Sequence, residues 1–501
     1  MKKNKKTVKT TNKKSNIFFK IISWLLLVSA IIATAFLIYF EVLPIMYLSI
    51  FIIGVGLLIF LLFKLLNNKR LKKWIKISIS IPSIILIIVF TLVCFYSYGT
   101  IDFFSNILDV GIRHDSYSVY VLDKSGYEKI EDLENKIIGV SDIADEATNK
   151  AIEKVSNKIE YNMAEFENIG ESVDAIKEET VDAIIALDSN IEILKEDSDE
   201  YDNLKAIYTF TVTTKVKTLT SKKDVSKENF VLYISGIDTN GKVAAKARSD
   251  VNILVAVNPK NKKILMLNTP RDYYVKLSSK KSMDKLTHAG VYGIEESVGT
   301  LENLYDINVD YYARVNFTTF VNIVEELDGI TVDVPVNFCE QTSSRTSSKK
   351  ICLKKGTQEL NGEQALALSR TRHTIAGGDR GRIENQMLVL KAIIDKALSP
   401  TILVKYNSLL NSVGDSVITN IEQKSITKLI KNQIKDASNW TIETYSVDGS
   451  DSSKPTYSTG SQKAYVMLPK EKTVLEAKKK FDTILETNKY TTEDSTTNSE
   501  E

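Results

Sequence analysis

Net charge, histidine, cysteine and arginine are all scarce in this 501-residue sequence. The formal net charge is only +2, so no field of the whole molecule indicates a nucleic acid or a peripheral membrane surface as partner. Only ten of its 65 basic residues are arginine, against 55 lysines. Any electrostatic function must therefore be local, and clusters of arginine indicate where such a charged site lies.

The few cysteines and glycines argue against two common kinds of site. No Gly-x-x-x-x-Gly-Lys follows the glycines of "AGVYG" or "AGGD", so these indicate turns rather than a nucleotide-binding loop. Cys339 and Cys352 have no histidine nearby, and two thiols are too few ligands for a metal site. The pair either closes a disulfide, worth about 3 kcal/mol, or remains as two thiols, and the sequence leaves both open.

Three long uncharged runs near the N-terminus predict a multi-pass membrane anchor. They are residues 21–40, 42–63 and 77–98, each long enough to cross about 30 Å of hydrocarbon. Eight lysines precede the first run, and six basic residues lie between the second and third. Because positive loops stay in the cytoplasm, everything after residue 98 is predicted to be extracytoplasmic. The first run is too long for a cleavable signal and lacks a small-residue cleavage site.

Residues 99–227 are predicted to form a small α/β accessory domain. Short apolar runs in "SVYVL", "KIIGVSD", "VDAIIAL" and "KAIYTFTV" predict strands, and "ESVDAIKE" predicts an amphipathic helix. This stretch resembles one lobe of bacterial extracellular solute-binding proteins, although no arginine placed to clamp a ligand is evident. Its predicted role is structural or in recognition rather than enzymatic. The lysine-rich segment 215–229 marks the boundary to the next domain.

Residues 228–485 are predicted to form a second α/β domain. The runs "FVLYISGID", "NILVAVNP" and "KILMLNTPRD" predict three strands with polar ends, followed by alternating helices and strands. This alternation predicts a mainly parallel sheet covered by helices on both faces. Asn361 with Gln364 predicts a capped helix, and Asp379 precedes a longer one. The polar tail 486–501 is predicted to be disordered.

Six of the ten arginines lie at strand ends or helix starts of this second domain: Arg248, Arg271, Arg370, Arg372, Arg380 and Arg382. The guanidinium fork binds two phosphate oxygens at once, which a lysine ammonium does not. If "SRTR" is extended, Arg370 and Arg372 point to the same side about 7 Å apart, a span that suits adjacent phosphates. Arg382 and Gln386 share a helix face near a helix start that favours anions.

Three acids, Asp238, Asp250 and Asp272, follow or precede neighbouring strands. Mg²⁺ usually takes one or two carboxylates and completes its shell with water and substrate phosphate. Arginines and carboxylates together indicate phosphoryl transfer, which needs no Ser, Cys or His nucleophile. The plainer interpretation makes Asp238 and Asp272 turn residues, any single arginine a solvated charge, and His288 and His373 hydrogen-bonded polar residues.

The ordered motifs "SGID", "ARSDVNILVAVNP", "LNTPRDYYV", "KLTHAGVYG", "LNGEQALALSRTRH" and "GGDRGRIENQ" resemble the LytR-CpsA-Psr (LCP) family of cell-envelope proteins. Three spans with an accessory domain further resemble its capsule-attaching members. The resemblance implies an α/β/α domain that encloses a channel for a polyprenyl tail. It implies transfer of a glycopolymer, capsular polysaccharide or teichoic acid, from an undecaprenyl-pyrophosphate carrier to peptidoglycan at the membrane, with pyrophosphatase activity as a side reaction.

The same resemblance implies roles for particular residues. Asp238 and Asp250 match acids around a Mg²⁺ or Mn²⁺ ion, and Asp250 is also the residue expected to activate the acceptor hydroxyl. The pyrophosphate-binding positions are Arg248, Arg271, Arg370, Arg372, Arg382 and Gln386. Of these, Arg271, Arg370 and Arg372 join Asp250 as the expected catalytic residues. The closing motif departs from the family pattern, since Arg380 replaces a phenylalanine and Asn385 an arginine.

Two other classes of function compete with the transferase. The family was historically labelled as transcriptional regulators, a function that needs a cytoplasmic DNA-binding element, whereas only short basic stretches face inside. Alternatively, the chain is a non-catalytic envelope sensor, with the arginines anchoring a lipid phosphate. The favoured hypothesis is the extracytoplasmic phosphotransferase, with the lipid-linked polymer, peptidoglycan and the bilayer as partners and no nucleic acid.

Overall fold

The computed structural model describes most of the chain, in two compact units. The first unit contains the N-terminal residues 1–105 with 423–436, and the second contains 106–422 with 437–501. The described residues are 3–39, 45–107, 112–197, 199–215, 221, 223–239, 243, 246–343, 350–371, 379–399, 417–422, 425–426, 428–429, 432–433 and 439–490.

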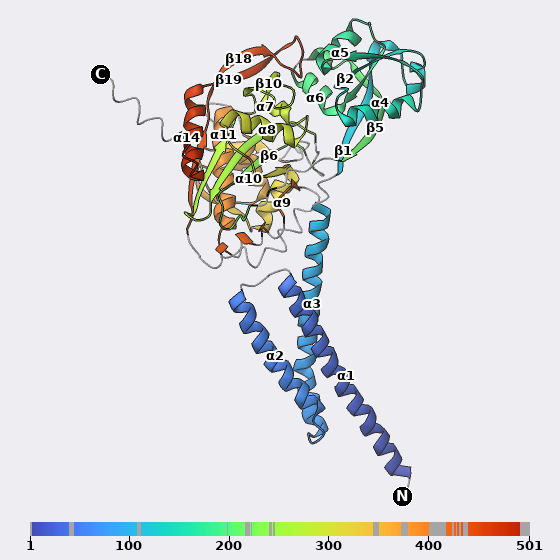
Figure 1. Ribbon diagram of the computed structural model, residues 1–501, viewed down its shortest axis with the longest axis vertical. Coiled ribbons are helices and arrows are strands. Elements are labelled where there is room, and N and C mark those ends of the chain that lie inside the picture. The colour runs from blue at the N-terminus through green and yellow to red at the C-terminus, as the bar shows by residue number, and fades with distance from the viewer. Residues whose placement is uncertain are drawn as a thin grey trace, which may run out of the picture. The chain divides into compact units, whose positions relative to one another are not determined.

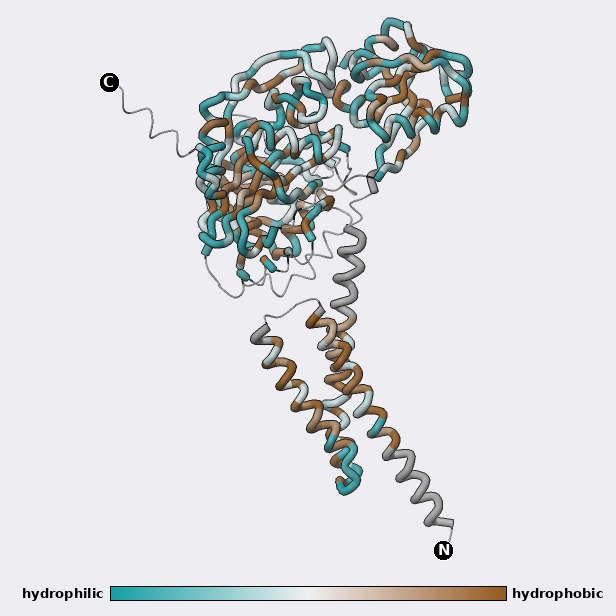
Figure 2. The backbone as a smooth tube through the Cα atoms, viewed as in Figure 1, coloured by the Kyte–Doolittle hydropathy of each residue, from teal (hydrophilic) through white to brown (hydrophobic). Residues whose placement is uncertain are grey.

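The first unit contains three long apolar helices, as the sequence predicts. They are α1 (Lys3–Tyr39), α2 (Ile45–Asn67) and α3 (Lys73–Ile107). Each holds a stretch long and apolar enough to cross a membrane, and Figure 2 shows their described parts coloured mostly as hydrophobic. Leu26 of α1, Leu62 of α2 and Phe90 of α3 belong to one buried cluster, so the three helices pack together.

In the second unit, residues 112–215 form a five-stranded sheet in the order β3-β2-β4-β1-β5. Strands β2, β3 and β4 run parallel, and β1 is antiparallel to β4 and β5. The strands predicted from the sequence and the helix "ESVDAIKE" are confirmed, whereas β3, α4 and α6 were not predicted. The bounds are β1 (Ile112–Leu122), β2 (Ile137–Ser141), α4 (Glu146–Ser156), β3 (Asn162–Phe166), α5 (Ile169–Lys177), β4 (Ala183–Leu187), α6 (Asp188–Asp197) and β5 (Leu204–Lys215).

A six-stranded sheet in the order β16-β11-β6-β7-β8-β17 is the centre of the remaining part (Figure 1). Its strands are β6 (Phe230–Gly236), β7 (Val251–Asn258), β8 (Lys263–Asn268), β11 (Tyr311–Val315), β16 (Val417–Thr419) and β17 (Thr441–Ser446). Only the β6–β11 and β8–β17 pairs are parallel; the β6–β7, β7–β8 and β11–β16 pairs are antiparallel.

The prediction of a mainly parallel sheet was therefore wrong, and the reason is the connections. Among the described residues no helix lies between β6, β7 and β8, and β7 joins β8 through four residues, 259–262. Such a short connection fits only antiparallel neighbours, because a parallel crossover needs a dozen residues or more. Because β7 is antiparallel to both neighbours, its first residues lie beside the last residues of β6 and β8. Residues before β7 can therefore join the same site as residues after β6 and β8.

Helices cover both faces of this sheet, which confirms the α/β/α layering. Helices α8 and α14 pack on one face through Val298, Leu301, Phe481 and Ile484. Helices α9, α10 and α11 belong to a second cluster with β12 to β15. The helix bounds are α7 (Leu286–Ala289), α8 (Ile294–Tyr305), α9 (Phe317–Glu326), α10 (Gly362–Arg370), α11 (Asp379–Ala397) and α14 (Glu471–Leu485).

The described residues also form four two-stranded ribbons: β9 (Tyr274–Lys276) with β10 (Met283–Lys285), β12 (Ile330–Val334) with β15 (Gly356–Leu360), β13 (Phe338–Gln341) with β14 (Lys350–Leu353), and β18 (Gly449–Pro455) with β19 (Lys463–Pro469). Cys339 and Cys352 are directly opposite on β13 and β14 and form a disulfide, which settles the alternative that the sequence left open.

The predicted disordered tail is ordered at its beginning. Tyr490 donates a hydrogen bond from its hydroxyl to Asp306 Oδ2 at 2.9 Å and from its backbone N–H to Asp482. Residues 491–501 lie outside the described residues.

Candidate active site

A cavity of about 570 Å³ lies between the six-stranded sheet and helices α9, α10 and α11. Strands β6, β7 and β11 contribute apolar side chains to one wall, among them Leu232, Ile234 and Ile253. The helices contribute the opposite wall, including Phe320 of α9 and Ile393 of α11. The cavity is thus the space between two layers of the domain.

The polar lining contains four guanidinium groups and three carboxylates, which leaves an excess of positive charge. Its members are Asp238, Arg248, Asp250, Arg271, Asn316, Glu340, Ser369, Arg370, Arg382 and Gln386. The structure therefore brings together every site residue proposed from the sequence except Arg372, which lies outside the described residues. Sequence reasoning did not find Asn316, Glu340 or Ser369, because nothing in their local pattern indicates a site.

Polarity changes along the length of the cavity. On α11 the lining residues Arg382 and Gln386 come before Leu390 and Ile393, all spaced to share one helix face. The step from Gln386 to Leu390 spans about 6 Å at 1.5 Å per residue. On the sheet, Leu232 and Ile234 lie within β6, whereas Asp238 lies beyond its end. The charged end of the cavity is therefore at the end of β6 and the start of α11.

An ion pair between Asp250 and Arg271 is at the centre of the charged end. Arg271 Nη1 donates to Asp250 Oδ1 at 2.7 Å, and Thr287 Oγ1 lies 3.5 Å from the same oxygen. Both side chains are largely buried, with 17% of Arg271 and 14% of Asp250 exposed. Asp250 Oδ2 has no hydrogen-bond partner among the described residues. One carboxylate oxygen thus fixes the side chain and the other remains available for chemistry.

The sheet register explains why these two residues meet. In the β7–β8 pair Ile253 is opposite Asn268, so continuing the antiparallel register places Asp250 opposite Arg271. In the β6–β7 pair Gly236 is opposite Val251, and the Asp250 N–H donates to the Gly236 carbonyl at 2.9 Å. The antiparallel β7 therefore starts where β6 and β8 end.

Helices α10 and α11 position the other cationic groups. Arg370 is the last residue of α10, so the expectation that "SRTR" is extended fails at its start; Thr371 is the first extended residue. The guanidinium carbon of Arg370 lies 4.8 Å from the centroid of the Phe317 ring, and its Nη1 donates to the Thr342 carbonyl. Gln386 Nε2 donates to the Ser369 carbonyl at 3.4 Å, and Arg382 is 6% exposed.

Arg380 does not belong to the cavity lining of the described chain. Its Nε lies 3.0 Å from Asp448 Oδ1, and its Nη2 donates to the Gly449 carbonyl at 3.1 Å. This arginine therefore attaches the first turn of α11 to the start of β18. Asn385, the other departure from the family pattern, is buried and donates to the Leu368 carbonyl of α10. The residues at these two positions therefore attach α11 to β18 and to α10.

Two plainer interpretations of the sequence also hold. Asp272 forms an ion pair with Arg271 at 3.4 Å and is not among the described residues that line the cavity. His288 is 2% exposed and lies 2.7 Å from Asp284, so it is a buried hydrogen-bonded residue. His373 lies outside the described residues.

Arg314 of β11 was missed by the sequence reasoning because it stands in an apolar strand. Its side chain is fully buried, and Nη2 contacts Ser249 Oγ at 3.1 Å and the Gly290 carbonyl at 3.3 Å. Burial lowers the pKa of its guanidinium below the ordinary value of an arginine. It holds the backbone beside Asp250 in place.

The donor set fits a divalent cation that binds together with a phosphate ligand. The described residues contain no group of three His, Cys, Asp or Glu side chains placed to hold a metal. Asp238 and Asp250 nevertheless line the same charged end, and the accessible Oδ2 of Asp250 is a suitable ligand. Two carboxylates suffice for Mg²⁺ or Mn²⁺ when water and phosphate supply the other oxygens.

The fold and site define an α/β/α protein with a cavity that is apolar at one end and rich in arginine at the other. The model of the LytR_cpsA_psr family matches residues 200–480, more than half of the chain. The chain belongs to this family.

Two similar proteins from Bacillus subtilis carry names of one kind. The polyisoprenyl-teichoic acid–peptidoglycan teichoic acid transferase TagT is 40% identical over 205 residues, which cover 40% of this chain and 63% of TagT. TagV, which has the same transferase description, is 37% identical over 233 residues. These residues cover 46% of this chain and 59% of TagV. The chain thus spans less than two thirds of either relative. The TagV crystal structure covers 52% of this chain and 98% of its own, at 32% identity and a TM-score of 0.43.

Replacing Arg380 with alanine tests its assignment as a structural tether. Lys470 and Arg380 hold the pKa of Asp448 below its ordinary value of 3.8. A carboxylate whose pKa is lowered by folding stabilises the fold at pH values above its ordinary pKa. This stabilisation is lost as pH falls through the folded-state pKa. We expect Arg380→Ala to lower the free energy of unfolding at pH 7 by less than about 1 kcal/mol, because the pair is half-exposed.

Thermal unfolding monitored from pH 7 to pH 3 checks this expectation. The difference between wild type and Arg380→Ala should shrink toward acid pH, while Lys472→Ala serves as an exposed control on α14. A difference that grows toward acid pH would contradict the tether.

Proposed function

We propose that this protein is a membrane-anchored phosphotransferase that moves a glycopolymer from an undecaprenyl-pyrophosphate carrier onto peptidoglycan. The observation that carries the proposal is that the cavity is apolar at one end and charged at the other. A lipid pyrophosphate has the same two parts, a hydrocarbon chain and a charged head. The apolar walls from β6, α9 and α11 suit a hydrocarbon chain. The arginines at the charged end suit two adjacent phosphates, which the guanidinium fork binds bidentately.

The positions of the arginines support separate roles for them. Arg271 is held in place by Asp250 and Asp272, which makes it a fixed donor beside the reacting phosphate. Arg370 and Arg382 approach from the ends of α10 and α11 on the opposite wall. Arg248 lies on the segment before β7, and Arg372 is the remaining proposed phosphate-binding and catalytic residue. Fixed positive groups stabilise charge that develops in phosphoryl transfer without reorganising.

Asp250 is the proposed base for the acceptor. The peptidoglycan hydroxyl oxygen attacks the phosphorus that carries the glycopolymer, and its proton passes to Asp250 Oδ2. The bond from that phosphorus to the bridging oxygen breaks, and undecaprenyl phosphate leaves. A new phosphodiester joins polymer and peptidoglycan. Alternatively, Asp250 Oδ2 would not act as the base but would hold, together with Asp238, a Mg²⁺ or Mn²⁺ ion, which when bound neutralises phosphate charge. Water in place of the hydroxyl would give the pyrophosphatase side reaction.

The names of the relatives make teichoic acid the first polymer to test, with capsular polysaccharide as the second. The three apolar helices and the lysines before the first of them support an anchor whose following domains lie outside the cytoplasm. The disulfide also supports this orientation, because disulfides persist in oxidising compartments.

Activity of the purified full chain with a polyprenyl-pyrophosphate-linked polymer, a peptidoglycan acceptor and Mg²⁺ tests the reaction. We expect Asp250→Asn and Arg271→Ala to lower kcat at least about 100-fold, since a positioned base and a fixed cation each contribute that much. Arg380→Ala is the matched control and should stay within about twofold of wild type. No turnover by the wild type, or full activity in Asp250→Asn and Arg271→Ala, would refute the transferase.

The native cysteines report the orientation of the domain. In cells without their wall, a membrane-impermeant maleimide should label Cys339 and Cys352 only after reduction with an impermeant phosphine. Cys94 lies in α3 within an apolar stretch and should remain unlabelled, and a Cys339→Ser/Cys352→Ser variant controls for it. Labelling of the pair only after the membrane is permeabilised would overturn the proposed topology.

A further inference from the structure

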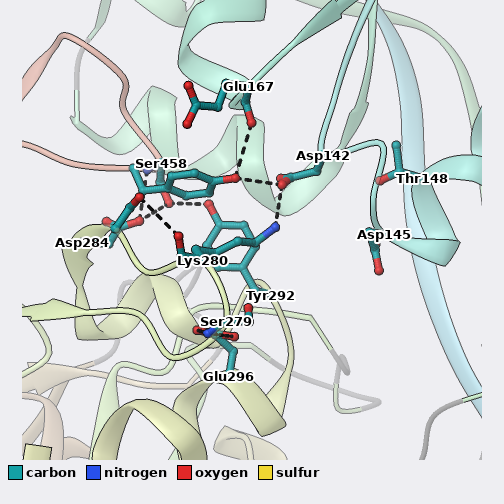
Figure 3. A network of polar contacts seen from close by, with 12 residues as sticks. Asp142, Asp145, Thr148, Glu167, Ser279, Lys280, Asp284, Tyr292, Glu296 and Ser458 are labelled. Carbon is teal, nitrogen blue, oxygen red and sulfur yellow. Dashed lines mark hydrogen bonds and ion pairs between the residues drawn. The ribbon is translucent and has the colours of Figure 1, made fainter. Parts of the chain in front are cut away.

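A second cavity, of about 350 Å³, lies between the five-stranded sheet domain and the catalytic part. From the five-stranded side it is lined by residues that follow β2 and β4, including Asp142, Asp145 and Asn190. From the catalytic side it is lined by Lys246, Lys280 and Tyr292, among others. Figure 3 shows side chains of both parts facing one another across this region, with Asp142 beside Lys280.

The position of this cavity in the sheet is the one where α/β proteins bind ligands. Strand β2 lies between β3 and β4, and all three are parallel. Helix α4, after β2, packs on the face with Val155 and Ile138, whereas α5, after β3, packs on the face with Val173 and Ile184. The chain therefore leaves the sheet in opposite directions next to β2. Ligands bind outside the carboxyl ends of strands at such a switch point.

The charges that line the cavity are already neutralised within the protein. Lys280 Nζ lies 2.5 Å from Asp142 Oδ1, and Lys246 Nζ lies 2.8 Å from Asp145 Oδ2. The Lys280 ammonium also lies 5.0 Å from the centroid of the Tyr292 ring. A charged ligand would add an uncompensated charge to this enclosed site, which is costly. An uncharged ligand is therefore favoured.

Asn190 supplies an acceptor that the protein itself does not use. Its side chain is 7% exposed, and Oδ1 accepts no hydrogen bond from any described residue. A buried polar atom without a partner costs about 1–3 kcal/mol, which a hydroxyl or amide N–H from a ligand would recover. Carboxylate, amide and ammonium groups are all within the lining. Hydroxyl groups, which both donate and accept, match this mixture best.

We propose that this cavity is a binding site for an uncharged carbohydrate of one or two rings. The volume lies at the lower end of the range of about 300–1,000 Å³ that small-molecule pockets occupy. The Tyr117 and Tyr292 side chains provide aromatic surface, and the polar lining provides partners for the hydroxyls. The site takes its walls from both parts of the unit, so the accessory domain binds its ligand only together with the catalytic domain.

Saturation-transfer NMR on the full chain in lipid nanodiscs tests this proposal without sugar-based detergents, which would compete. The probes are glucose, N-acetylglucosamine and its β-1,4 dimer, with glycine and inorganic phosphate as charged comparators. We expect saturable binding of at least one sugar, weakened about tenfold or more by Asn190→Ala and unchanged by Asn203→Ala on an exposed turn. Ser279→Trp, which places a large side chain at an exposed position of the lining, should also abolish binding.

Each outcome decides the matter. If none of the three sugars binds at up to 20-fold molar excess over a millimolar protein sample, the proposal is wrong. Binding of glycine or phosphate without the sugars refutes the ligand class. Sugar binding that survives both Asn190→Ala and Ser279→Trp, in variants with the wild-type melting temperature, places the ligand elsewhere and equally refutes the site.

Discussion

The ion pair between Asp250 and Arg271 is the contact on which the candidate active site depends. It joins the residue before β7 to a residue after β8 at 2.7 Å, and the antiparallel register of these strands places the two opposite each other. With one carboxylate oxygen fixed in this way, the other faces the cavity unpaired within the described chain. The same pair orients the guanidinium that would hold a phosphate. Reversing the direction of β7 would carry Asp250 to the far edge of the sheet.

Most secondary structure of the site was predictable, but the sheet direction was not. Strands β6, β7 and β8 and helices α10 and α11 stand where hydrophobic periodicity and capping residues predict them. Periodicity does not report whether neighbouring strands run parallel, whereas the four-residue connection between β7 and β8 does indicate an antiparallel pair. The prediction of α/β/α layers was still correct, because it depends on apolar residues on both faces of the sheet and not on the direction of the strands.

The arginines show the same limit at the level of single residues. Because arginine is scarce in this sequence, its clustering indicated a site. Four of the clustered arginines do line one cavity: Arg248, Arg271, Arg370 and Arg382. Composition did not separate these from Arg380, whose partner Asp448 is 68 residues away in the chain. Nor did it find Arg314, which supports the site from within a buried strand. Contacts between distant residues decide such roles, and a single sequence does not contain them in readable form.

The segment 246–250 connects the two cavities of this unit. Lys246 lines the cavity shared with the accessory domain, and Arg248 and Asp250 line the cavity of the candidate active site. Lys246 is also 3.6 Å from the buried carboxylate of Asp115 on β1. The accessory domain therefore contacts the strand end that carries the proposed base, four residues away. A domain placed in this way is part of the framework of the site rather than an appendage.

If the cavity binds a lipid pyrophosphate with its chain toward the apolar end, a side chain that fills this end should affect long-chain substrates selectively. The most direct measurement is the KM of an Ile393→Trp variant, which fills that end, for an undecaprenyl-linked and a geranyl-linked substrate. We expect KM for the long-chain substrate to rise at least about tenfold, while that for the short-chain substrate stays within about twofold. An equal effect on both substrates, or none on either, would contradict it.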